Sequence, residues 1–338
     1  MTCDLTIIMP SYNMGEYISE ALDSIFMQKT SYSYQVVVAD DCSDDNTIEI
    51  VKSYQSKYPN KITLLTSETN QKLYKNVLRA YAITKTPYFC VLDPDDYYCS
   101  EDFLQKALDF LNQNEDYTIY MSNVYKKMPD GSLEKYFDFE QEYINVDFQD
   151  YINGRAILSQ TSGCVYRNVI FKDGVPEKLL NPPEKSWEVS FRGDAFRNAL
   201  HVFYGKAHIS KDCNTVYRIT DKGIWQGMCQ LKRDVFNAII YRDMYVYFDE
   251  KYAAFLNLSY NFFMKCLVEF FDEIENIDNE AEQVKILKDI SKLKKYFSLR
   301  MDLINTEQKK MQELKCAKNN AIKNFLGKFL SCFRFRIK

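Results

Sequence analysis

Short apolar runs recur along the first 115 residues of the chain, and a longer stretch of mixed polarity follows each of them. The runs are rich in β-branched and aromatic residues, which is typical of buried strands. Polar or turn-forming residues close them, as Pro10 closes the first. The predicted strands are LTIIMP (5–10), YQVVVAD (34–40), KITLLTS (61–67) and YFCVLD (88–93).

The stretches between these strands carry apolar residues at helical spacing. In the first stretch, Ile18, Leu22 and Ile25 fall on one helical face. Apolar strands that alternate with helices form a parallel sheet covered on both faces, so we predict an α/β fold. Ligands of such sheets bind beyond the carboxyl ends of the strands. The predicted helices are 16–28, 44–58 and 74–84.

The pattern changes after residue 115. The segment 117–139 predicts two strands joined by a turn at Asp130–Gly131. Further strands are expected within 160–168 and 202–220, and the chain beyond about Gly223 is expected to be mostly helical. The expected units are therefore an α/β domain over 1–222, with halves 1–115 and 116–222, and a mostly helical region over 223–338.

The formal charge of −4 hides an uneven distribution. Residues 315–338 hold seven of the 43 Lys and Arg and no Asp or Glu. This leaves 36 basic against 47 acidic residues, about −11, in the rest of the chain. An acidic body argues against a general nucleic-acid-binding protein. Hydrophobic residues make up 46% of the chain, which excludes wholesale disorder.

The cysteine and histidine content limits the kinds of disulfide and metal site that we expect in the protein. The ten cysteines include no CxxC pair, and the first residues lack the pattern of a signal peptide, so we expect reduced thiols in a cytoplasm. Two histidines are too few to favour a histidine-based zinc site. No uncharged apolar run approaches the roughly 18 residues of a membrane-spanning helix, so we expect none.

Acidic residues gather after two of the predicted strands, in VVADDCSDDN and VLDPDD. Asp40, Asp41, Asp93 and Asp95 should meet at one edge of the sheet, where close carboxylates repel one another and lose hydration if buried. A cation should offset them. Oxygen ligands favour Mg²⁺ or Mn²⁺, which would also bind a nucleotide diphosphate. The alternative is that such acids cap the next helix, as Asp96 could.

Four motifs follow one another in the first part of the chain: IIMPSYNMGEYISEALDSIFMQ, VVVADDCSDDNT, NQKLYKN and YFCVLDPDDYY. In their order and approximate spacing they resemble the family 2 glycosyltransferases with the GT-A fold. The resemblance covers roughly residues 4–115. It implies a Rossmann-like, mostly parallel sheet flanked by helices, and transfer of a sugar from a nucleotide-sugar donor, usually a UDP-sugar, with Mn²⁺ or Mg²⁺. Residues 1–115 would then bind the donor and 116–222 the acceptor.

The resemblance implies roles for five residues of the donor half. Pro10 and Tyr12 would begin the nucleobase pocket, with the Tyr12 ring against the base. Asp40 and Asp41 would contact uracil N3–H and the ribose hydroxyls, which carboxylates can accept from. Lys75 would face the donor phosphates as a point charge. The alternative for Lys75 is an exposed helix lysine.

Asp93 and Asp95 match the D-x-D pair of the family, and Asp95 is the stronger candidate for the metal ligand. The chain departs from the family at two positions. Lys72 stands where glycine is common, so the local backbone or the donor contact should differ. Thr220 stands where a histidine often follows the Tyr-Arg pair of VYRITDKGIWQG, which puts a metal or diphosphate contact from that position in question.

The second half of the chain resembles the family more loosely. Asp194, in FRGDAFRNAL, matches the catalytic base that would deprotonate an acceptor hydroxyl, with Glu188 in reserve on the acceptor side. Asp194 could instead be an acid at a helix N-terminus. Trp225 lies between two glycines and resembles an aromatic platform for a sugar of the acceptor. The alternative for Trp225 is a partly buried aromatic.

We therefore expect a metal-dependent, inverting, non-processive glycosyltransferase for bacterial surface polysaccharide or glycoconjugate synthesis. It would act on a hydroxyl of a glycan or lipid-linked acceptor. QLKRD at 230–234 lacks the tryptophan of the Q-x-x-R-W motif that processive relatives carry. One alternative is a nucleotidyltransferase or phospho-alditol transferase on the same fold, but MPSYNMGEY is not a Gly-rich basic loop. The other is a catalytically dead binding or scaffold protein, which the retained acids disfavour.

The C-terminal segment AIKNFLGKFLSCFRFRIK carries its apolar residues at helical spacing, flanked by lysine and arginine. This pattern favours a helix in the interface of an anionic membrane, reached through residues 315–338. The protein would then lie peripherally on the inner face of a membrane. The alternative is docking on the protein's own body or on a partner subunit. The apolar positions are Ile322, Phe325, Leu326, Phe329, Leu330 and Phe333.

Overall fold

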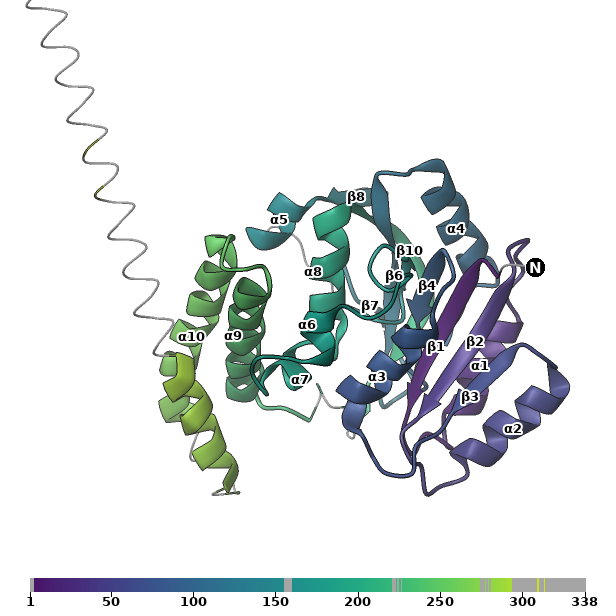
Figure 1. Ribbon diagram of the computed structural model, residues 1–338, viewed down its shortest axis with the longest axis horizontal. Coiled ribbons are helices and arrows are strands. Elements are labelled where there is room, and N and C mark those ends of the chain that lie inside the picture. The colour runs from purple at the N-terminus through teal and green to yellow at the C-terminus, as the bar shows by residue number, and fades with distance from the viewer. Residues whose placement is uncertain are drawn as a thin grey trace, which may run out of the picture.

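The computed structural model of the protein has one mixed sheet with helices on both of its faces (Figure 1). The strands predicted in the first 115 residues are all present, because each supplies residues that are buried in the sheet. The described residues are 3–154, 160–220, 223, 225, 227–273, 277, 279, 281–293, 309 and 313. The strands are β1 Leu5–Ser11, β2 Tyr34–Asp40, β3 Ile62–Leu65, β4 Tyr88–Val91, β5 Tyr97–Tyr98, β6 Tyr117–Lys127, β7 Leu133–Lys135, β8 Tyr143–Val146, β9 Cys164–Arg167 and β10 Lys206–Arg218.

The three helices predicted between the first strands are confirmed, and their apolar faces are buried. The helix after β5 was not predicted, although Phe103, Leu104 and Leu108 lie at helical spacing and are buried. The helices are α1 Ile18–Phe26, α2 Thr47–Lys57, α3 Lys72–Ile83, α4 Phe103–Gln113, α5 Phe148–Ile152, α6 Glu177–Leu180, α7 Trp187–Ser190, α8 Asp194–Tyr204, α9 Gln230–Tyr247 and α10 Ala253–Glu273.

The sheet combines a parallel half with a mixed half. Its strand order is β3-β2-β1-β4-β9-β6-β10-β5, and the first four strands are parallel, as the alternation of strands and helices predicts. β9 then runs antiparallel between β4 and β6. β6 and β7 form the predicted hairpin, in which Gly131 adopts a φ of 84° that suits a residue without a Cβ. The chain thus has the predicted α/β class, with a sheet that is parallel over its first four strands and mixed beyond them.

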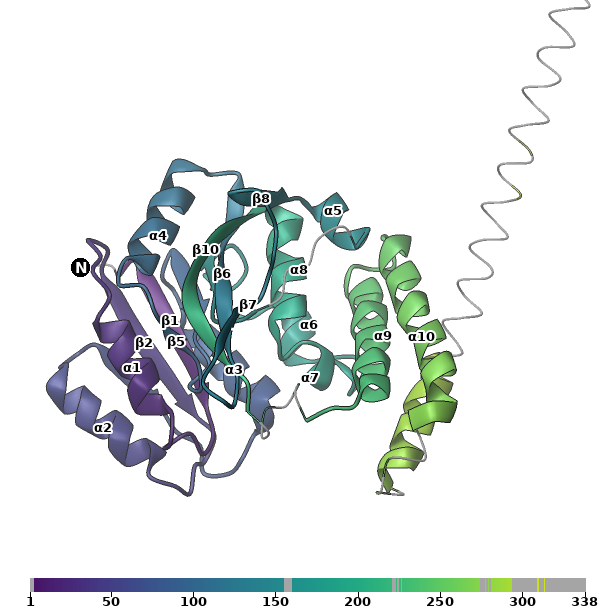
Figure 2. The ribbon, with the colours of Figure 1, turned by 180° about the vertical axis from the view of Figure 1, so that it is seen from behind.

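The two faces of the sheet bury separate cores. On one face, α1, α2 and α4 pack on the strands, with Leu22, Val51 and Leu108 among the fully buried residues (Figure 2). On the other face lie α3 and α8, whose Val77 and Phe196 belong to the second core. Because both faces are covered, ligands can reach the parallel strands only at their edges.

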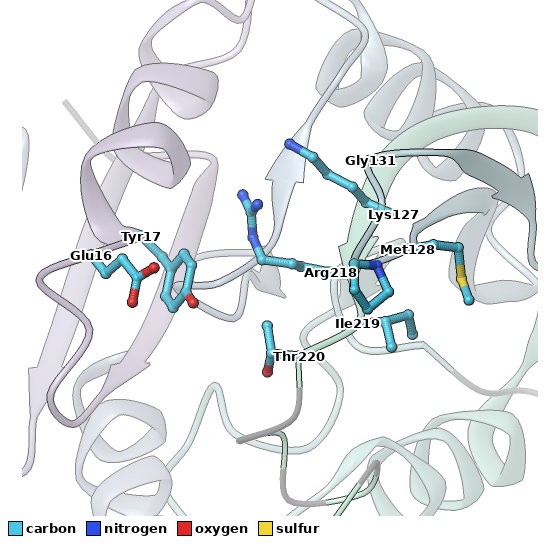
Figure 3. Close-up of a pocket in the computed structure, with 9 residues that line it drawn as sticks. Glu16, Tyr17, Lys127, Met128, Gly131, Arg218, Ile219 and Thr220 are labelled. Atoms are coloured by element: carbon cyan, nitrogen blue, oxygen red, sulfur yellow. The ribbon is translucent and has the colours of Figure 1, made fainter.

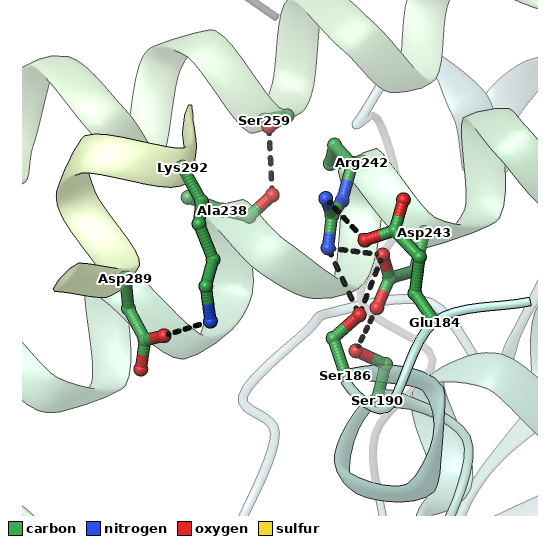
Figure 4. Close-up of polar contacts among 9 residues, drawn as sticks. All are labelled: Glu184, Ser186, Ser190, Ala238, Arg242, Asp243, Ser259, Asp289 and Lys292. Atoms are coloured by element: carbon green, nitrogen blue, oxygen red, sulfur yellow. Dashed lines mark hydrogen bonds and ion pairs between the residues drawn. The ribbon is translucent and has the colours of Figure 1, made fainter. Parts of the chain in front are cut away.

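The C-terminal helices α9 and α10 extend the second core, and they also form two smaller buried clusters with each other and with residues of 277–293. Met244 of α9 and Phe255 of α10 are fully buried in the same cluster as Trp187 of α7. Arg242 and Asp243 of α9 form an ion pair of 2.6 Å, and the Asp243 carboxylate accepts a hydrogen bond from Ser190 of α7 at 2.6 Å (Figure 4). The helices therefore brace the segment that leads into α8.

One prediction about the second half of the chain is wrong at its boundary, and another concerns residues that the structure does not describe. The predicted strand at 202–220 begins too early, because Val202–Tyr204 complete α8, and β10 starts only at Lys206. The predicted membrane-binding segment 315–338 lies outside the part of the chain that the structure describes. Within the described ranges, no helix is long and apolar enough to cross a bilayer. The domain boundary near residue 222 stays a prediction.

Candidate active site

The predicted acidic residues converge at the carboxyl edge of the parallel strands. Asp40 closes β2 and pairs in register with Ser11, so Tyr12 follows directly at the same edge. Asp93 lies two residues beyond the end of β4, which is the strand on the other side of β1. The strand order thus brings together three loops that are far apart in the sequence, as the pattern of strands predicts.

Pro10 marks the point where β1 and β4 stop pairing. The Leu92 N–H donates to the Ile8 carbonyl at 2.9 Å, which is the last rung between these strands. Pro10 is the next residue of β1 that faces β4, and it has no N–H to offer. The chain after β4 is therefore released from the ladder immediately before Asp93.

Residues in the left-handed region shape the loops that follow β1, β2 and β3 at this edge. They are Asn13 (φ 54°) after β1, Cys42 (φ 66°) after β2 and Lys72 (φ 69°) after β3. Lysine rarely adopts this conformation, since its Cβ crowds the following carbonyl. Lys72 stands where the family resemblance leads us to expect glycine. Its backbone nevertheless has the conformation that favours glycine.

Asp40 and Asp41 are both buried and hold their own loops together. The Asp40 carboxylate accepts hydrogen bonds from the Ser43 N–H at 2.9 Å and from the Ser43 hydroxyl at 2.5 Å. Asp41 Oδ1 accepts one from the Gln71 N–H at 2.7 Å. Asp41 thus ties the loop after β2 to the start of α3. Its Oδ2 receives no hydrogen bond from the described residues.

The residues 93–96 form a tight turn, in which the Asp96 N–H donates to the Asp93 carbonyl at 2.9 Å. Asp96 is buried, and its carboxylate accepts from the Ser162 hydroxyl at 2.5 Å and from the Arg218 N–H at 3.0 Å. Burial, then the charges of Asp95 and Asp93, raise the pKa of Asp96 well above its ordinary value. Asp96 therefore has a structural role, and it does not cap a helix.

Asp93 and Asp95 differ from the other acids of the edge. Among the described residues, no other residue donates a hydrogen bond to either carboxylate, and both side chains are half-buried. Burial and the neighbouring Asp95 raise the pKa of Asp93 to about 7. Burial also raises the pKa of Asp95. Two half-buried carboxylates that repel each other make this turn a favourable place for a cation.

Two arginines that the sequence analysis did not single out lie against these acids. Arg197 of α8 is only 4% exposed, donates to the Tyr81 hydroxyl at 3.0 Å, and opposes the rise in the pKa of Asp93. Arg218 ends β10 and opposes the rise in the pKa of Asp95. Part of the positive charge predicted for this site therefore comes from the protein itself, and no spacing in the sequence reveals it.

Asp194 is the first residue of α8 and lies near the turn. Its carboxylate accepts from the Gln160 N–H at 2.8 Å and from the Ala195 N–H at 2.7 Å, as expected for an acid at a helix N-terminus. Its charge also contributes to the raised pKa of Asp93, so the two carboxylates are neighbours. Glu188 lies instead on α7, close enough to Tyr74 to help raise the pKa of that phenol.

The remaining predicted residues lie at or near the surface. Tyr12 is 45% exposed. Lys75 is exposed in the first turn of α3, and none of its contacts ties it to the acids. Trp225 is 38% exposed and packs edge-on against Phe236 of α9, with Arg233 over its ring. The tryptophan thus has both a packed side and an exposed side.

A pocket of about 400 Å³ opens where the end of β10 meets the loop before α1 and the hairpin after β6 (Figure 3). Its walls include Glu16, Tyr17, Lys127, Arg218 and Thr220. Arg218 also contacts the 93–96 turn, so the pocket adjoins the acidic residues. Thr220, which takes the place of the expected histidine, supplies a hydroxyl to its wall.

Asp93 and Asp95 are better suited to bind a divalent ion that a bound ligand also coordinates than to hold a metal ion by themselves. Within the described ranges, no group of three or more His, Cys, Asp and Glu could hold a metal ion. Asp93 and Asp95 supply two carboxylates, which suits an ion such as Mg²⁺ that keeps water molecules and shares phosphate oxygens. A closed site of four protein ligands, as for structural zinc, is not present among these residues.

The sequence model described as "Glycosyl transferase family 2" matches residues 6–175, about half of the chain. An uncharacterised protein of Mycobacterium tuberculosis is 26% identical over 66% of this chain and 61% of its own length. Poly(ribitol-phosphate) beta-N-acetylglucosaminyltransferase TarS of Staphylococcus aureus is 24% identical over 76% of this chain and 44% of its own length. The chain thus spans less than two thirds of these relatives.

Solved structures share the fold. The complex of S. aureus TarS 1–349 with UDP-GlcNAc matches with a TM-score of 0.54 at 20% identity, over 85% of this chain and 79% of that one. Mannosyltransferase PcManGT from Pyrobaculum calidifontis, in complex with GDP-Man and Mn²⁺, matches with a TM-score of 0.50 at 14% identity, over 89% and 84% of the two chains. At these identities the likeness concerns the fold alone.

Proposed function

Because this chain belongs to glycosyl transferase family 2, we propose that it transfers one sugar, or a few, from a UDP-sugar to a hydroxyl of a bacterial surface glycan or lipid-linked acceptor. The enzyme class follows from the family. We propose four further features of the reaction: the UDP-sugar, the divalent metal, inversion at the anomeric carbon and the acceptor.

The Asp93–Asp95 pair carries the proposal. These two half-buried carboxylates receive no hydrogen bond from other described residues, whereas those of Asp40, Asp41 and Asp96 each accept at least one. A protein gains nothing in stability from two such repelling groups. Their arrangement is instead suited to a ligand that brings positive charge, such as Mg²⁺ or Mn²⁺ bound to a nucleotide diphosphate. The Mn²⁺ in the PcManGT complex supports this assignment.

The residues around the pair fit the binding of a nucleotide. The exposed ring of Tyr12 can stack on the base, and Asp41 Oδ2 can accept from the uracil N3–H or from a ribose hydroxyl. Lys75 can place its charge near the phosphates from the first turn of α3. The UDP-GlcNAc bound to TarS, which has the same fold, supports a UDP-sugar as the donor.

Asp194 is the proposed general base. It takes the proton of the acceptor hydroxyl, whose oxygen then bonds to the anomeric carbon while the bond from that carbon to the UDP oxygen breaks. The electron pair leaves with UDP, and attack from the opposite side inverts the configuration. Gln160 and Ala195 orient the carboxylate through their N–H groups. When bound, a divalent ion acts as a Lewis acid toward the departing diphosphate.

A polyol-phosphate chain is one acceptor of the proposed class. The names of two relatives support it. TarS is a poly(ribitol-phosphate) beta-N-acetylglucosaminyltransferase, and GgaA of Bacillus subtilis, 26% identical over 54% of this chain, is a minor teichoic acid biosynthesis protein. Exposed Trp225 and half-buried Glu188 are the proposed contacts to the acceptor.

The test is a screen of UDP-sugars for UDP release with Mn²⁺, with and without acceptor, in the wild type and in Asp95→Asn. We expect release with one or a few donors and its loss in the variant. Asp44→Asn removes an exposed charge at the same edge and should leave release unchanged. Equal turnover by Asp95→Asn would refute the metal assignment. Release of pyrophosphate from UTP and a sugar phosphate, without release of UDP from any UDP-sugar, would identify a nucleotidyltransferase, and no turnover in either assay would favour a binding protein.

We also propose that residues 315–338 hold the enzyme at the inner face of a membrane through an anionic lipid surface. The basis is the sequence alone, in which seven Lys and Arg flank an apolar stripe. Deletion of 315–338 should abolish sedimentation with anionic vesicles and preserve UDP release. Unchanged sedimentation of the shortened protein would contradict this proposal.

A further inference from the structure

Arg218 makes three different contacts around the turn that carries Asp95. Its backbone N–H donates to Asp96 Oδ1 at 3.0 Å, and its Nε donates to the backbone carbonyl of Asp95 at 3.0 Å. Its Nη2 forms an ion pair with Glu20 of α1. One residue at the end of β10 thus joins the turn to a helix on the face of the sheet.

The guanidinium of Arg218 is held in a single orientation. Its carbon lies 5.1 Å from the centre of the Tyr17 ring and 5.7 Å from that of the Tyr97 ring. The side chain is 15% exposed, so little of it is free to move into water. Contact with two aromatic rings together with two directed N–H bonds is suited to arginine, since a lysine offers one point charge without a fork.

These contacts fix the backbone of Asp95 and leave its carboxylate unbonded. Asp96 is anchored on one side by Ser162 and on the other by the Arg218 N–H, while the Asp95 carbonyl is anchored by Arg218 Nε. No described residue other than Asp95 itself donates to the Asp95 side chain. The carboxylate is therefore presented from a rigid support, which is what a group that binds metal requires.

We propose that Arg218 is a positioning residue, which holds the backbone of Asp95 so that the carboxylate meets a divalent cation. The inference rests on the proposed function, because it takes Asp95 to be the metal ligand. It adds that the hydrogen bond from Nε, and not only the charge of the arginine, sets the affinity for the metal. In this proposal Arg218 acts through the backbone of Asp95 and is not itself a ligand of the metal.

The test compares Arg218→Lys, which keeps the charge and loses the fork, with Glu20→Gln, which removes the ion pair and keeps the bond to Asp95. The readout is binding of Mn²⁺ in the presence of saturating UDP, followed by the electron paramagnetic resonance signal of free Mn²⁺. We expect the dissociation constant of Mn²⁺ to rise about tenfold or more in Arg218→Lys, as for other residues that support a metal ligand. Glu20→Gln should change it less than about twofold, in line with a partly exposed ion pair.

Thermal unfolding of both variants separates positioning from a purely structural role. Similar midpoints with weaker Mn²⁺ binding only in Arg218→Lys would support the proposal. Equal Mn²⁺ binding by the wild type and Arg218→Lys would overturn it and leave the proposed function standing. Loss of cooperative unfolding in both Arg218→Lys and Arg218→Gln would also overturn it. Failure of the wild type to bind Mn²⁺ with UDP would overturn the proposed metal site and this inference together.

Discussion

Ser162 donates a hydrogen bond from Oγ to Asp96 Oδ2 at 2.5 Å, across 66 residues of sequence. The same Oγ accepts from the Asp93 N–H at 3.3 Å. Both side chains are buried, so the bond fixes the turn between β4 and β5 against the start of β9. The Asp96 carboxylate thus accepts hydrogen bonds that hold the fold together. The carboxylates of Asp93 and Asp95 accept none from other described residues.

Replacement of Asp96 by alanine should destabilise the protein without altering the chemical groups of the site. It leaves the Ser162 hydroxyl and the Arg218 N–H buried without an acceptor. Each such loss costs about 1–3 kcal/mol, so we expect the free energy of unfolding to fall by about 2–4 kcal/mol. Urea denaturation measures it.

Asp95→Asn is the matched control, because it changes a carboxylate one position away. Here the substitution removes a charge that repels Asp93 and that no other described residue hydrogen-bonds. The free energy of unfolding should stay the same or rise, while UDP release is lost. A loss of stability as large as that of Asp96→Ala would show that both acids serve the fold.

Lys72→Gly should stabilise the protein, because Lys72 has a φ of 69°. Relief of the left-handed conformation gains about 1–2 kcal/mol, and the extra freedom of glycine in the unfolded chain costs about 0.5–1 kcal/mol. The expected net gain is about 0.5–1 kcal/mol in the free energy of unfolding. Lys72→Ala keeps a Cβ and should bring no gain, and equal effects of the two variants would argue against strain at this position.

Asp194→Asn should lower the rate of sugar transfer by about 10²–10⁴-fold, the range found for loss of a general base. The amide can still accept from the Gln160 N–H, so the fold and the affinity for the donor should be preserved. Initial rates at saturating donor and acceptor, with the KM of the donor, measure both. Glu188→Gln is the control, and a larger loss there than in Asp194→Asn would move the base to α7.

The stability of the protein should fall as the pH drops below about 6.5, in part through His201. Burial lowers the pKa of His201 from 6.5 to about 3, because the charged form is disfavoured in the core. The unfolded chain therefore binds a proton between these pH values and the folded protein does not, so the stability present above pH 6.5 is lost on acidification.

Between pH 7 and pH 4.5, the free energy of unfolding of His201→Gln should fall by about 2–3 kcal/mol less than that of the wild type. The amide can replace the contact of Nδ1 with the Arg197 carbonyl at 2.7 Å. Urea denaturation at a series of pH values gives the comparison. Burial lowers the pKa of His208 to about 4, so His208→Gln should remove a smaller part. Parallel pH profiles of the wild type and His201→Gln would contradict the prediction.

The local pattern of the sequence determined the parallel half of the fold. A strand buried on both faces must be a continuous apolar run, and the helices between such strands must have an apolar face, so both are visible without a structure. The positions of Asp40 and Asp93 follow as well, since parallel strands bring their carboxyl ends to one edge. The apolar runs, the helical spacing and the residues that end each strand are all properties of residues that are neighbours in the sequence.

The tertiary structure alone decided which acids are free to bind a ligand. The partners of Asp96 come from 66 and 122 residues away, and they meet it because β9 inserts beside β4 and β10 pairs with β5. Arg197 and Arg218 reach the site in the same way, from a helix and a strand whose periodicity concerns only their own packing. Hydrogen bonds and charges act between atoms that are close in space, and that closeness was fixed by the pairing of distant strands.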